Sequence, residues 1–164
     1  MPESPMVSLY SLLLQSSGLS APEAASLHKV SDQTVNDWAS GDAAPSEKAL
    51  QDIYRLIDLQ NHAARWVLHV LMDEDRASSN ARVTLCVTDD INESGTLGWP
   101  TPSAMNAAVR RLLEMAGDNL RGRIQLAFNP QSKSDICFVG VRLRPDGTFM
   151  APGETGSASD DEDE

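Results

Sequence analysis

The chain has 164 residues, 41% of them hydrophobic, which suits one domain of ordinary size or two small ones and excludes a wholly disordered protein. Its formal net charge is −11, and residues 151–164 supply six of those charges, so much of the acidity lies outside the predicted fold. An acidic protein is an unfavourable starting point for DNA binding, because non-specific affinity comes from lysine and arginine. The apolar runs are too short for a membrane span, and the N-terminus lacks the features of a signal peptide, so we expect the protein in the cytoplasm. The only two cysteines, Cys86 and Cys137, are then expected to be buried thiols.

Helix signals recur through the first part of the chain. Ser20 and Glu23 have the spacing of a capping box, and Gly18 and Gly41 stand where helices should end. His28 falls at a break and is expected on the surface of a turn. These signals predict, after a flexible segment 1–7, helices over 8–17, from 20 to the break near 28, over 32–40 and from 46 to about 72.

The second half of the chain is predicted to mix strands with one helix. Alternating apolar residues indicate strands at 82–88, 123–128 and 135–144, with a loop over 89–100 and a helix over 102–116. The expected fold class is therefore α+β. It consists of an N-terminal all-α helix-turn-helix domain over 8–72, a linker over 73–81, a small β-α-β-β domain for dimerisation over 82–151 and a disordered acidic tail over 152–164.

The segment between the second and third predicted helices has the residues that a helix-turn-helix needs. Small side chains are required where the two helices cross, and an N-cap, an apolar inner face and a final glycine are required for the second helix. This segment resembles the Cro/C1-type repressor family, through Glu23, Ala24-Ala25, Val30-Ser31, Thr34-Val35, Trp38, Gly41 and Pro45. A weaker resemblance, through Gly98-Trp99 as well, is to YdiL-like or anti-CRISPR-associated repressors, which join such a domain to a small α/β dimerisation domain.

The resemblance implies that residues 32–40 form a recognition helix that enters the major groove of DNA. Gln33 would read a base edge, ideally adenine through two hydrogen bonds. Asn36 or Asp37, one turn later, would read a neighbouring base. Thr34 and Ser31 would contact a phosphate or a thymine methyl group.

The preceding helix would contribute to the backbone contacts. Its first residues, Ser20 and Ala21, would offer backbone N–H groups to a phosphate, and Lys29 would supply the cation beside the turn. Asp32 and Asp37 depart from the family, which more often has glutamine or arginine at these places. An aspartate can accept a hydrogen bond from cytosine, but it repels phosphate.

The sequence thus predicts a cytoplasmic, homodimeric repressor that binds double-stranded DNA, with no membrane association. We expect no enzyme activity, no cofactor and no metal site, since glycine-rich phosphate loops, nucleophile elbows and metal-ligand clusters are missing from the sequence. A second interpretation stays open. The acidic recognition helix also fits a protein-interaction module, antitoxin-like or an adaptor, that keeps the fold without strong DNA affinity and binds a protein partner through its C-terminal half.

Overall fold

The computed structural model describes residues 7–77, 83–96, 98–128, 136–138, 142–143 and 149–150. The predicted flexible segment 1–7, apart from its last residue, and the predicted disordered tail 152–164 lie outside the described residues. The helices are α1 (Leu9–Ser17), α2 (Ala21–His28), α3 (Asp32–Ser40), α4 (Glu47–Ala77), α5 (Ile91–Thr96), α6 (Pro102–Met115) and α7 (Asp118–Arg121). The strands are β1 (Val83–Val87), β2 (Ile124–Phe128), β3 (Ile136–Phe138), β4 (Arg142–Leu143) and β5 (Phe149–Met150).

Local capping sets the ends of the first three helices. The Ser20 hydroxyl accepts the Glu23 N–H and the Glu23 carboxylate accepts the Ser20 N–H, so the predicted capping box is confirmed. Gly18 and Gly41 end α1 and α3 in the left-handed conformation, with φ of 76° and 89°. Glycine adopts this conformation without the steric cost that a Cβ atom brings. The helix positions predicted for the first 46 residues are therefore confirmed.

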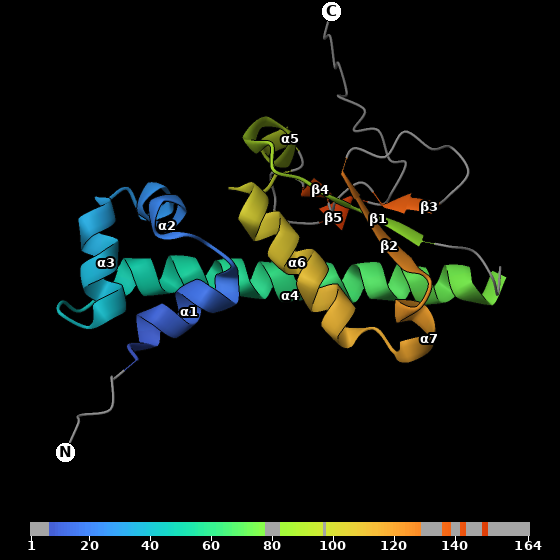
Figure 1. The fold of residues 1–164 in the computed structure, drawn as a ribbon, viewed down its shortest axis with the longest axis horizontal. Helices are drawn as coiled ribbons and strands as arrows, with labels where there is room; N and C mark the ends of the chain where they lie inside the picture. The colour runs from blue at the N-terminus through green and yellow to red at the C-terminus, as the bar shows by residue number, and fades with distance from the viewer. Residues whose placement is uncertain are drawn as a thin grey trace, which may run out of the picture.

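Helix α4 is the central element of the molecule. Figure 1 shows α1, α2 and α3 gathered around its first half and α6 crossing further along. Ile53 and Leu56 are buried in the half of α4 beside α1, α2 and α3, while Val67 and Leu71 are buried in its second half. The helix continues to Ala77, so the beginning of the predicted linker 73–81 is helical, and 78–82 lies outside the described residues.

Helix α6 packs on α4 through small side chains. Ala104 and Ala108 are buried, together with Leu112, and α6 makes its most extensive contact with α4 rather than with a strand. Small residues let two helices approach closely, which increases the area that they bury. As a result, one continuous core links Tyr10 in α1 to Leu120 in α7, across the predicted boundary between domains.

The strands are short. β1 pairs in parallel with β2 and with β3, with Val83 opposite both Ile124 and Ile136, while β4 and β5 pair antiparallel. Cys137 lies opposite Thr84, and Cys86 lies opposite Ala127. The two cysteines are therefore on neighbouring strands but are not direct cross-strand partners.

The predicted fold class, α+β with a separate β-α-β-β domain, is wrong. The described chain is mostly helical, and three helices rather than one stand between the first two strands, including α5 in the predicted loop 89–100. The principal helix of that half is part of the helical core, because its alanine face fits α4. Within the predicted strand 135–144, residues 136–138 and 142–143 are strand, and the other positions lie outside the described residues.

Candidate nucleic-acid interface

Helices α2 and α3 are joined by the short turn 29–31 and pack closely on one another. Ala24, Ala25 and Val35 are buried where the helices meet, and Trp38 is 6% exposed. Lys29 ends α2 in the left-handed conformation, with φ of 57°, and is the only non-glycine residue at positive φ in the described ranges. The sequence predicted this arrangement from the small residues, the cap and the final glycine.

The outward face of α3 carries the side chains predicted to read bases. Asp32, Gln33 and Asn36 are exposed, and Asp37 is half-buried. The Gln33 amide Nε2 donates a hydrogen bond of 2.6 Å to Asp37 Oδ1, one turn further along. Two predicted base readers are therefore joined to each other on the surface of the helix.

The predicted phosphate contacts of Ser31 and Thr34 compete with the cap of α3. Ser31 Oγ accepts the Thr34 N–H at 3.2 Å, and the two hydroxyls lie 2.9 Å apart. Thr34 is half-buried, whereas Ser31 is exposed. The Ser31 and Thr34 hydroxyls thus already hold the first turn of α3. Only the hydroxyl proton that is not shared between them can still be donated to a phosphate.

The start of α2 is less open to phosphate than predicted. The Ser20 N–H and hydroxyl both donate to Glu23 Oε2, at 2.8 and 2.6 Å, and Pro22 has no N–H. Burial pushes the pKa of Glu23 upward, but hydrogen bonds from Ser20, Ser103 and Thr101 outweigh it and lower the pKa. The ionised Glu23 carboxylate therefore lies where the resemblance placed a phosphate. Of the two backbone N–H groups predicted to bind phosphate, those of Ser20 and Ala21, only the Ala21 N–H remains.

Behind the turn, His28 is enclosed by aromatic rings, contrary to the surface position expected for it. Its side chain is only 2% exposed, and its ring centroid lies 6.0 Å from that of Tyr10 and 5.9 Å from that of Trp38. Neither ring nitrogen has a hydrogen-bond partner among the described residues; Asp52 Oδ2 is 3.9 Å from Nδ1. Burial lowers the pKa of His28, more than the charge of Asp52 raises it, with Lys48 adding to the lowering.

We expect this histidine to make stability depend on pH. Because its pKa is lower in the folded than in the unfolded chain, the unfolded chain binds more protons, and stability falls as pH drops below about 6.5 toward the folded value. Tyr10 does not titrate in this window, since burial raises its pKa to about 12. Thermal melts of the protein and of His28→Phe between pH 5 and 8 measure the effect. The melting temperature of the natural chain should fall further on acidification, by on the order of a few degrees; parallel curves would contradict the assignment.

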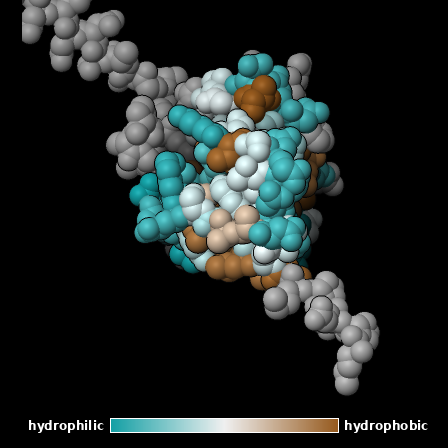
Figure 2. Space-filling view, turned by 90° about the vertical axis from the view of Figure 1, so that its left-hand side faces the viewer, coloured by the Kyte–Doolittle hydropathy of each residue, from teal (hydrophilic) through white to brown (hydrophobic). Residues whose placement is uncertain are grey.

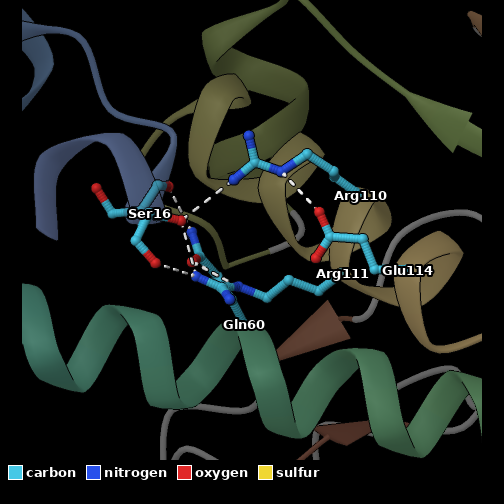
Figure 3. A network of polar contacts seen from close by, with 6 residues as sticks. Ser16, Gln60, Arg110, Arg111 and Glu114 are labelled. Carbon is cyan, nitrogen blue, oxygen red and sulfur yellow. Dashed lines mark hydrogen bonds and ion pairs between the residues drawn. The ribbon is translucent and has the colours of Figure 1, made fainter. Parts of the chain in front are cut away.

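A polar network fastens α1 to α4 and α6, and the sequence did not indicate it. Figure 3 shows Arg110 and Arg111 reaching toward Ser16 at the end of α1. Arg111 donates to the Ser16 carbonyl at 2.7 Å and to its hydroxyl at 3.0 Å, while Gln60 Nε2 donates to the Ser17 carbonyl at 2.8 Å. Burial lowers the pKa of Arg111, and the neighbouring Arg110 adds to this. These arginines thus satisfy carbonyls at a helix C-terminus, where a positive charge is favourable.

The charge over α2 and α3 is unfavourable to phosphate. Residues 21–40 contain Glu23, Asp32 and Asp37 but only Lys29 as a permanent cation. Figure 2 faces the α3 end of the molecule and shows hydrophilic residues with single hydrophobic ones among them, and further hydrophobic residues along the lower edge. The exposed apolar side chains Val7, Leu9 and Leu12 belong to the beginning of the described chain and to α1.

The described residues bring together no group of three or more histidine, cysteine or carboxylate side chains able to hold a metal ion. No helix in the described ranges has the length and apolar character needed to cross a membrane. No family model and no curated protein matches the chain.

Proposed function

We propose that this chain is a cytoplasmic, sequence-specific DNA-binding regulator that acts as a homodimeric repressor, and that it is a binding protein rather than an enzyme. The observation that carries the proposal is the outward face of α3. Gln33 and Asn36 are exposed on a helix that is held against α2 across a short turn, and the backbone between them is fixed by buried Val35. Amide side chains on such a helix can pair with base edges in the major groove.

Base contacts have to supply most of the affinity. Lys29 is the one permanent cation between residues 21 and 40, so few phosphates are neutralised and few counterions are released on binding. Non-specific binding is therefore weak, and the salt dependence of specific binding is shallow. Two copies on paired half-sites, about one helical turn of DNA apart, increase the affinity without further cations.

Removing either amide from α3 should weaken binding to a selected site. A duplex recovered from a randomised pool by the natural protein is titrated by fluorescence anisotropy with Gln33→Ala and with Asn36→Ala. Each variant should lose about 1–3 kcal/mol of discrimination between this duplex and a scrambled one, or about five- to 150-fold. Gln51→Ala is the matched control, because Gln51 is also an exposed glutamine bonded to an acid one turn away, but on α4. Equal losses in all three variants would contradict a reading role for α3.

A protein-interaction module is the second candidate, and the position of Glu23 favours it. Its ionised carboxylate occupies the start of α2, and Asp32 stands at the start of α3, so both helix N-termini repel phosphate. In this case the natural protein selects no duplex even at low salt. Affinity capture with the intact chain then recovers a protein partner, bound through the C-terminal half, whose binding is unchanged by Gln33→Ala and Asn36→Ala.

A further inference from the structure

The hydrogen bond between Gln33 and Asp37 restricts what the glutamine can offer to a base. One of the two amide protons of Gln33 is donated to Asp37 Oδ1 at 2.6 Å. The carbonyl Oε1 and the second amide proton remain, on the oxygen and the nitrogen that are both bonded to Cδ in one planar group. The held amide therefore has one acceptor and one donor left to offer to a base.

A free glutamine is less selective than a held one. Rotation of its terminal amide about χ3 exchanges the positions of O and NH₂, and both amide protons are then available to acceptors. Adenine presents a donor, N6, and an acceptor, N7, in the major groove, while guanine presents two acceptors, O6 and N7. A held amide matches adenine. Against guanine, the amide oxygen would face O6, and two acceptors cannot form a hydrogen bond with each other.

We propose that Gln33 and Asp37 form one adenine-reading unit in which Asp37 is a positioning residue that excludes guanine. This inference rests on the proposed function. It gives a reason for an acidic side chain on a recognition helix, where it reduces phosphate affinity: the carboxylate fixes the donor and acceptor order of the amide. The ordinary alternative is a surface pair that only supports the helix and carries no base preference.

The chain supplies matched variants for the test. Asp37→Ala removes the acceptor and one negative charge. Asp37→Asn removes the same charge but keeps an oxygen that can accept from Gln33. Asp42→Ala removes an exposed carboxylate near the end of α3 that is bonded to Ser40 at 2.7 Å and not to Gln33. Comparison of the three separates the hydrogen bond from the change in charge.

The experiment starts from a randomised duplex pool. Duplexes selected by the natural protein are sequenced, and the position whose preference is lost in Gln33→Ala is then varied through all four bases in anisotropy titrations. The natural protein should prefer adenine over guanine there by about ten- to 100-fold. In Asp37→Ala this ratio should fall at least about fivefold, because the freed amide can also donate to guanine. Asp37→Asn and Asp42→Ala should keep it.

The possible failures are distinguishable. If the natural protein selects a site but Asp37→Ala keeps the same adenine-to-guanine ratio, or if the position that depends on Gln33 is not adenine, the positioning role is wrong and the DNA-binding function stands. If the natural protein selects no sequence while melting cooperatively, the proposed function and this inference fall together. Loss of the ratio in Asp42→Ala as well would assign the effect to charge and overturn the inference.

Discussion

Replacing Gln60 with leucine should lower the free energy of unfolding by about 2–4 kcal/mol. The side chain is fully buried, and its Nε2 donates to the carbonyls of Ser17 and Ala104, at 2.8 and 3.0 Å, while its Oε1 accepts from Arg111 at 3.4 Å. Leucine fills a similar volume, so the loss comes from hydrogen bonds rather than from a cavity. The unpaired Ser17 carbonyl contributes most to this loss, because a carbonyl at a helix C-terminus has no hydrogen-bond partner within its own helix.

Urea denaturation of the natural protein, Gln60→Leu and Gln51→Leu measures this effect. Gln51 lies on the exposed side of the same helix, so its replacement should change stability by no more than about 0.5 kcal/mol. An unchanged slope against urea would show that the loss is one of stability and not of compactness. A Gln60→Leu protein as stable as the natural one would mean that α1, α4 and α6 do not meet as described.

Replacing Gly18 with alanine should destabilise the protein by about 2–4 kcal/mol, for two reasons that can be separated. The residue has φ of +76°, where a Cβ atom is strained, and a Cβ there would lie 2.9 Å from the Cβ of Ala107 and 3.2 Å from the carbonyl oxygen of Ser103. The Ser103 oxygen belongs to the backbone of α6 and cannot move aside as a flexible side chain can. Alanine would therefore push α6 away from the end of α1.

Gly41→Ala is the control for the conformational part of this loss. Gly41 has a similar φ of +89°, but the nearest atom to its added Cβ is the Cβ of Ser8, at an ordinary 3.9 Å. Its replacement should cost only the left-handed strain, about 1–2 kcal/mol. The difference between the two variants in denaturant melts reports the close approach of α1 to α6. Equal losses would remove the basis for a core shared between the two halves.

The local signals in the sequence were sufficient for the first part of the fold. Capping boxes and left-handed glycines act over a few residues, so Ser20, Glu23, Gly18 and Gly41 predicted the ends of α1, α2 and α3 without knowledge of the rest. The exposed positions of Gln33 and Asn36 followed from helical periodicity in the same way. Their reading of DNA bases, and any dimer, remain predictions.

Contacts between distant segments decided what the sequence could not. The strand pattern of the second half suggested a separate domain, but the alanine face of α6 buries against α4 and makes one helical core. His28 was expected on the surface because it ends a helix beside a polar turn, yet Tyr10 and Trp38 cover it from two other helices. Arg111 donates a hydrogen bond to the carbonyl of Ser16, which is far away in the sequence. By itself, the sequence determined where α1, α2 and α3 begin and end, because caps and glycine turns are local. Which faces are covered was decided by tertiary packing, because burial depends on the shape of every element that meets there.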